Sequence, residues 1–177
     1  MKYNIGTNNG FTLVELIVVM IIVGILATVA GLGLVQVVQG MVFTKMNAVT
    51  IQKGQIAMTK LVKEFNNISA VTEASDSSIT FTSYKNGVPS SHTVALSGNT
   101  VILDGDVIID QVNTAPLKRF SLRYYDSYDS PAQTTWPLLP PLFTTSSRRI
   151  IEIYLPLTGA SGAVSEFKER VAPRNLQ

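Results

Sequence analysis

The feature that most constrains this chain is the apolar run from Phe11 to Val35. As an α-helix it would be roughly 37 Å long, enough to cross the ~30 Å hydrocarbon core of a bilayer with some tilt. A cleavable secretory signal has a shorter apolar core, about 7–15 residues, behind a basic start. Here the run is longer than that, and Lys2 is the only basic residue ahead of it. The sequence therefore predicts one membrane-spanning helix.

The orientation of this helix follows from the nearest basic residues. Lys2 precedes the run, and the next basic residue is Lys45. Because positive charge is retained on the cytoplasmic side, we expect the N-terminus in the cytoplasm and the C-terminal bulk outside it.

One acidic residue, Glu15, lies inside the apolar run. An unpaired carboxylate in a membrane is costly, whereas a paired one is tolerated. Glu15 lies one helical turn from Phe11, so a cut after Gly10 would bring a new ammonium group near it, on the same chain or on a neighbouring copy. The alternative is a glutamate that reaches the membrane edge and has no partner.

The stretch from Gly10 to Glu15, GFTLVE, followed at once by the apolar run, resembles the class III signal of type IV pilins and type II secretion pseudopilins. The resemblance implies that residues 1–10 are a leader that a prepilin peptidase removes after Gly10. It implies that Phe11 becomes N-methylated and that Glu15 acts in assembly with neighbouring subunits. Because the family is structural, we expect no enzymatic activity and no cofactor.

Two departures from the major pilins indicate a minor subunit. The helix-kinking proline of that family is replaced by Leu32 between Gly31 and Gly33, and the chain has no cysteine pair. Glycine weakens a helix by about 1 kcal/mol, so Gly24 to Gly33 is the stretch expected to melt in a filament. Diffuse similarity near residues 51–69 and at the C-terminal end is closest to J-type minor pseudopilins and W-type minor pilins.

The remaining chain predicts an α+β fold of pilin type, with a long N-terminal helix packed on a mostly antiparallel sheet. The division we expect is a spanning helix at 11–35, an amphipathic continuation at 36–70 and a β-rich globular domain at 71–177. The helix is expected to run from residue 12 to about 68. Its apolar stripe consists of Ile51, Met58, Leu61, Val62, Phe65 and Ile68.

Alternating apolar and polar residues after residue 77 predict β-strands. The dipeptide Asn86-Gly87 predicts a tight hairpin turn between the first two of them. The expected strands cover residues 78–85, 91–96, 100–104, 107–112, 117–126, 148–157 and 164–171.

Two segments are candidates for ligand or partner contacts. Residues 127–147 form a proline-rich loop that carries Trp136, and such loops are functional or pack back on their own sheet. Lys118, Arg119 and Arg123 form a basic patch with two tyrosines, which could bind DNA. Solvated edge charges explain the same residues, and we favour that interpretation, so nucleic acid is not expected as a partner.

Catalytic and metal-binding patterns are weak. His92 is the single histidine and is expected on a strand surface without a catalytic role. Asp104, Asp106 and Asp110 could supply oxygen ligands to calcium, but aspartate is equally typical of turns. We therefore predict no metal.

These observations predict a minor structural subunit of a type IV pilus that initiates assembly or caps the tip. The alternatives are a minor pseudopilin that drives protein export by type II secretion, and a DNA-uptake or adhesive subunit. The partners implied are other pilin or pseudopilin subunits, prepilin peptidase, the inner-membrane assembly platform and membrane lipid. The implied location is the bacterial inner membrane, single-pass with a periplasmic C-terminal domain, and then the pilus or pseudopilus.

Overall fold

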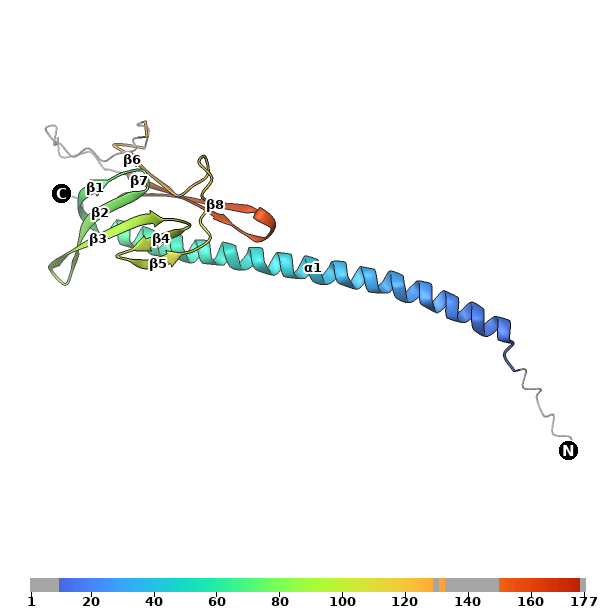
Figure 1. Cartoon of the computed structure of the whole chain (residues 1–177). Helices are drawn as coiled ribbons and strands as arrows, with labels where there is room; N and C mark the ends of the chain where they lie inside the picture. The colour runs from blue at the N-terminus through green and yellow to red at the C-terminus, as the bar shows by residue number, and fades with distance from the viewer. Residues whose placement is uncertain (1–9, 129–130, 133–149, 176–177) are drawn as a thin grey trace. The chain divides into compact units, whose positions relative to one another are not determined.

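The computed structural model describes residues 10–128, 131–132 and 150–175 (Figure 1). In these ranges one long helix, α1 (Leu13–Asn66), is followed by β-strands in antiparallel sheets. This confirms the predicted α+β class and is consistent with a pilin-like fold. The chain divides into two compact units, Met1–Thr44 and Lys45–Gln177, and α1 contributes residues to both.

In the first unit, every described residue is exposed, although most are apolar. A window of α1 has a mean hydropathy of 2.8 with none of it buried. In the described part of the chain, α1 is the one helix long and apolar enough to cross a membrane. Apolar side chains in such number need an apolar environment outside this chain, as a membrane or other subunits provide.

In the second unit, one face of α1 is buried. Its buried residues are Thr50, Gly54, Ala57, Met58, Leu61 and Phe65. The spacing of three and four residues is that of a helix face against a core. Ile51 was expected on this face, and that expectation is wrong, because its side chain is 42% exposed. The polar Thr50 and the small Gly54 occupy the face there instead. The helix also ends at Asn66, not at residue 68, and Ile68 begins a strand.

The strands form two sheets where one was expected. A five-stranded sheet has the order β1-β2-β3-β4-β5, and a three-stranded sheet has the order β6-β7-β8. All neighbouring pairs are antiparallel. The strands are β1 (Ile68–Ala74), β2 (Ser78–Lys85), β3 (Val88–Ser97), β4 (Thr100–Leu103), β5 (Asp106–Ile109), β6 (Ser121–Tyr125), β7 (Ile150–Thr158) and β8 (Val164–Val171).

Several strand predictions are confirmed by these bounds. β2 and β8 have the expected limits, and the expected hairpin joins β2 to β3. Both turn residues, Asn86 and Gly87, have positive φ (53° and 80°), as the tight turn requires. β1 was not anticipated from the sequence.

Two predicted strands are shorter than expected by two residues or more. The strand expected at 117–126 covers only β6, so Lys118 and Arg119 precede it. The strand expected at 107–112 ends at Ile109, and Gln111 then has φ of 61°. After this turn, Val112 forms an isolated antiparallel bridge with Leu157 in β7. Its own N–H donates to the Asn99 carbonyl at the β3–β4 turn, so this short segment bonds to both sheets.

The core of the second unit is shared by α1 and the two sheets. Phe65 of α1 and Phe81 of β2 meet edge to face, with ring centroids 5.8 Å apart. On the other sheet, Ile151, Ile153 and Leu155 of β7 are fully buried. Because this core consists of residues from α1 and from both sheets, it holds the second unit together without residues 10–44.

Candidate functional site

The junction between Gly10 and Phe11 lies just before the first turn of α1. Both residues lie outside regular secondary structure, and Phe11 is 82% exposed. The helix begins at Leu13. The backbone on either side of this peptide bond is therefore free of helical hydrogen bonds and accessible, which a peptidase requires. Residues 1–9, the rest of the expected leader, lie outside the described residues.

Thr12 begins the helix by capping it. The N–H of Glu15 donates to Thr12 Oγ1 at 3.2 Å, and the N–H of Leu16 donates to the Thr12 carbonyl at 3.2 Å. This is the threonine half of a capping box, which satisfies an N–H that the first turn leaves without a helical partner. The role of Thr12 was missed, although the spacing T-x-x-E ahead of an apolar run signals it.

Glu15 occupies the first turn of α1 and is exposed. A carboxylate there interacts favourably with the positive end of the helix dipole. This explains part of the tolerance for a charge at the start of an apolar helix. Among the described residues, the Glu15 carboxylate has no hydrogen-bond or ion-pair partner, so a cation from outside the chain, such as a terminal amine, can pair with it.

Gly24, Gly31 and Gly33, the residues expected to melt, all lie within α1. A Cβ at any of them would meet nothing within 4 Å. The hydroxyl of Thr28 donates to the Gly24 carbonyl at 2.9 Å, a bond typical of helices that bend. The single chain is helical throughout this stretch, and melting in an assembly stays a prediction.

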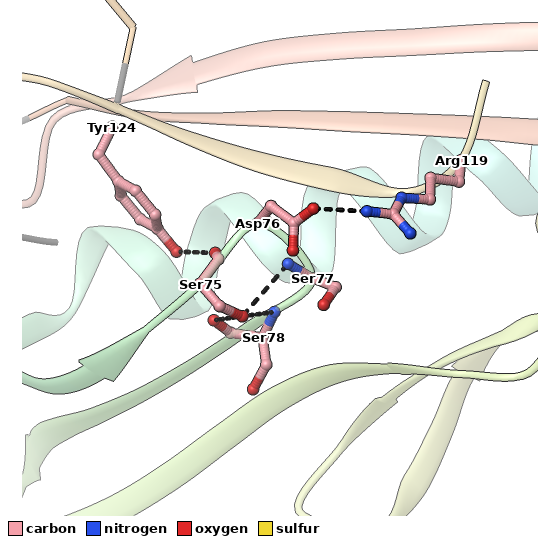
Figure 2. Close-up of polar contacts among 6 residues, drawn as sticks. All are labelled: Ser75, Asp76, Ser77, Ser78, Arg119 and Tyr124. Atoms are coloured by element: carbon pink, nitrogen blue, oxygen red, sulfur yellow. Dashed lines mark hydrogen bonds and ion pairs between the residues drawn. The ribbon is translucent and has the colours of Figure 1, made fainter. Parts of the chain in front are cut away.

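The candidate basic patch is largely engaged within the chain. Figure 2 shows Arg119 pointing toward Asp76 in the β1–β2 turn, with Nη2 2.6 Å from Oδ2. Lys118 forms an ion pair with Glu166 at 2.8 Å. This hydrogen bond raises the pKa of Lys118 and lowers that of Glu166. Arg123 is exposed on β6, and Trp136 lies outside the described residues. Lys118 and Arg119 are thus paired within the chain, Arg123 is exposed, and a ligand patch at these residues stays a prediction.

The same turn is fixed to β6 by a buried tyrosine. Tyr124 donates through its hydroxyl to the Ser75 carbonyl at 2.8 Å (Figure 2). The Leu122 N–H donates to the Asp76 carbonyl. Burial, and secondarily the charge of Asp76, raises the pKa of Tyr124, so its hydroxyl stays protonated as a donor. These contacts explain Arg119 as one member of a structural link between the two sheets.

Two of the aspartates considered as calcium ligands, Asp104 and Asp110, bond to different partners. Asp104 Oδ2 lies 2.6 Å from His92 Nδ1, and Asp104 Oδ1 accepts the Thr93 N–H. Partial burial raises the pKa of Asp104, but these hydrogen bonds outweigh it and the net pKa is lowered. Asp110 instead pairs with Lys53 at 2.9 Å. Within the described ranges, no group of three His, Cys, Asp or Glu side chains is placed to hold a metal ion.

In the comparisons with known proteins, a family model matches the N-terminal part of the chain. Residues 6–31 match the family model for the prokaryotic N-terminal methylation motif. No curated protein and no solved structure matches the chain. The matched range contains Gly10, Phe11 and Glu15, together with the capped start of α1. The chain therefore carries a prokaryotic N-terminal methylation motif, consistent with the class III signal of the type IV pilin and pseudopilin family.

Proposed function

We propose that this chain is a membrane-anchored minor subunit of a type IV pilus, acting in the initiation of assembly or at the tip. The observation that carries the proposal is the exposed Gly10–Phe11 peptide, one residue ahead of the Thr12 cap, inside the matched methylation motif. The capped, exposed apolar helix fits a single-pass anchor. Such a helix can exchange lipid for the helices of other subunits.

In this proposal, the chain is processed and does not itself catalyse a reaction. Prepilin peptidase removes residues 1–10, and Phe11 is methylated on its new amine. Residues 11–35 lie first in the inner membrane and later in the filament core. The helix continues from residue 36 to Asn66, and residues 71–177 lie in the periplasm. The partners are other pilins and the inner-membrane assembly platform.

Processing is tested by mass spectrometry of filaments sheared from cells. We expect a peptide that begins at a methylated Phe11, in small amount relative to the major subunit. The same peptide confined to membranes would favour the alternative, a pseudopilin of a type II secretion system, because that class shares the signal. A chain that still begins at Met1 in both fractions would contradict the proposal.

The role of Glu15 is tested by removing its charge. Glu15→Ala and Glu15→Gln should insert and be cut after Gly10 as in the wild type, but fail to enter filaments, because the carboxylate pairs with the amine of a neighbouring subunit. The Thr12 hydroxyl still caps the helix in both variants. Glu73→Gln, which removes an exposed carboxylate from β1, is the control and should assemble normally. Normal incorporation of Glu15→Gln would rule out the charge as the assembly determinant.

A further inference from the structure

A pocket of about 260 Å³ lies between the part of α1 in the second unit and two turns that face it. Lys45, Val49 and Lys53 line it from the helix, and Gln111 and Gly159–Ala160 line it from the turns. Asn47 Oδ1 accepts the Ala160 N–H at 2.9 Å, which holds the turn after β7 against the helix. A hydrogen bond across this wall gives the pocket a defined shape.

The two lysines of the pocket differ in their partners. Lys53 is paired with the carboxylate of Asp110, with Nζ 2.9 Å from Oδ1. Lys45 forms no ion pair or hydrogen bond with any residue in the described ranges. The pocket therefore carries one uncompensated positive charge beside the apolar side chains of Met46 and Val49. This combination suits a ligand with an anionic group next to an apolar body.

The position of Lys45 in the sequence indicates which ligand is available. The run from Leu16 to Thr44 carries no charged side chain, and Glu15 and Lys45 bracket it. As α-helix, as the structure has it, this run is about 44 Å long. A bilayer including both headgroup layers is about 40–45 Å thick. If Glu15 lies in one headgroup layer, Lys45 reaches the other.

We propose that this pocket binds the headgroup phosphate of an anionic phospholipid, in the leaflet on the C-terminal side of the membrane. Lys45 pairs with the phosphate, and the Met46 and Val49 side chains contact the glycerol and the first methylenes. The Gln111 amide can bond a hydroxyl of the headgroup. The inference rests only on the membrane anchor in the proposed function, and needs neither cleavage nor filament assembly.

The test is native mass spectrometry of the full chain in detergent, with phosphatidylglycerol or phosphatidylcholine of the same acyl chains. Wild type should retain phosphatidylglycerol in preference to phosphatidylcholine. Lys45→Gln should reduce that preference about fivefold, since one lysine near a lipid surface contributes about 1 kcal/mol. Lys60→Gln, an exposed lysine of the same helix outside the pocket, should leave the preference unchanged.

A second variant tests the pocket rather than the charge alone. Val49→Glu places a carboxylate in the pocket and should abolish the preference. Three outcomes would each overturn the proposal. The wild type could retain both lipids equally, Lys45→Gln and Lys60→Gln could reduce the lipid preference equally, or Val49→Glu could keep the full preference. A dimer would also overturn the proposal if it excluded lipid and if Lys45→Gln dissociated it. The pocket would then hold part of a second copy of the chain and not a lipid.

The anchor is tested separately by alkaline extraction of wild-type membranes. Release of the chain would remove the anchor and with it the proposed function. Retention of the chain in membranes, together with no lipid preference in detergent, would overturn the lipid site alone.

Discussion

At the scale of single residues, Glu152 is the buried charge on which the three-stranded sheet depends. It lies near the start of β7, the central strand of that sheet, and is 1% exposed. Its carboxylate accepts hydrogen bonds from Arg170 Nε at 2.7 Å and Tyr125 Oη at 3.1 Å, and pairs with Lys168 Nζ at 3.1 Å. The Arg170 guanidinium also lies 4.4 Å from the centroid of the Tyr125 ring. Burial alone raises the pKa of Glu152, but the bonds to Arg170, Lys168 and Tyr125 outweigh it and the pKa is lowered.

Replacing this carboxylate should destabilise the second unit at neutral pH. Glu152→Gln leaves Arg170 and Lys168 without their charged acceptor, which should cost about 2–3 kcal/mol. Because the pKa of Glu152 is lower in the folded state than in the unfolded state, its contribution is full above the unfolded pKa, about 4.3, and is lost as the pH falls through the folded pKa. Urea unfolding from pH 7 to pH 3 should therefore show the difference between wild type and variant shrinking on acidification.

The control for this variant is Glu169→Gln. Glu169 lies on β8 next to Arg170 in sequence, but is exposed. Its replacement should change the free energy of unfolding by less than about 0.5 kcal/mol. If Glu152→Gln had the same stability as Glu169→Gln at pH 7, the network around Glu152 would not stabilise the sheet.

At the scale of elements, the contact between α1 and the three-stranded sheet depends on Gly54. A Cβ on Gly54 would overlap the ring of Phe167 in β8 and lie 2.9 Å from Leu157 Cδ1 in β7. The glycine therefore lets the helix backbone approach the sheet closely, at the expense of helix propensity. α1 is continuous through Gly54.

Adding a methyl group at this contact should destabilise the protein. Gly54→Ala gains about 1 kcal/mol in helix propensity but forces Phe167 and Leu157 to move, at about 1–3 kcal/mol. We expect a net loss of stability, measured as a lower midpoint of thermal unfolding. Gly40→Ala is the matched control, because a Cβ at Gly40 of the same helix meets nothing within 4 Å. An equal or higher midpoint for Gly54→Ala would mean that the close contact is not needed.

The elements also show what the sequence can and cannot predict. The alternation of apolar and polar residues predicted β2 and β8, and the dipeptide Asn86-Gly87 predicted a hairpin. Both predictions succeeded because these signals are local in the sequence. The separation into two sheets was not predictable, because strand pairing is non-local: β1 to β5 pair in one sheet, and β6 to β8 pair in the other. β1 was missed because its sequence, ISAVTEA, has little alternation, and its strand pairing contains two register shifts.

The same distinction holds for the candidate site. The motif from Gly10 to Glu15 is contiguous, so the sequence alone located it, and the family model matches residues 6–31, which contain it. The predicted ligand patch included Lys118, Arg119 and Arg123, of which Lys118 and Arg119 form ion pairs in the structure. Whether a charge is free depends on residues far away in sequence, here Asp76 and Glu166, and no local pattern reveals these pairs.

At the scale of the whole molecule, the two units have opposite relations to water. The described residues of 10–44 are all exposed and mostly apolar, whereas the buried hydrophobic residues in the described ranges all lie at Ala57 or later. Folding of the second unit thus does not draw on residues 10–44, and solubility of the chain is limited by them.

A fragment that begins at Lys45 should therefore fold in water without detergent and unfold cooperatively, whereas the full chain should need detergent or lipid. A fragment that begins at Lys60 is the matched control. It lacks Gly54, Ala57 and Met58, so the sheets lose part of the helix face that covers them, and we expect it to aggregate or unfold at low temperature. The measurements are size-exclusion chromatography and thermal unfolding followed by circular dichroism. Aggregation of the longer fragment, or equal stability of the two, would show that the first turns of α1 in this unit do not complete its core.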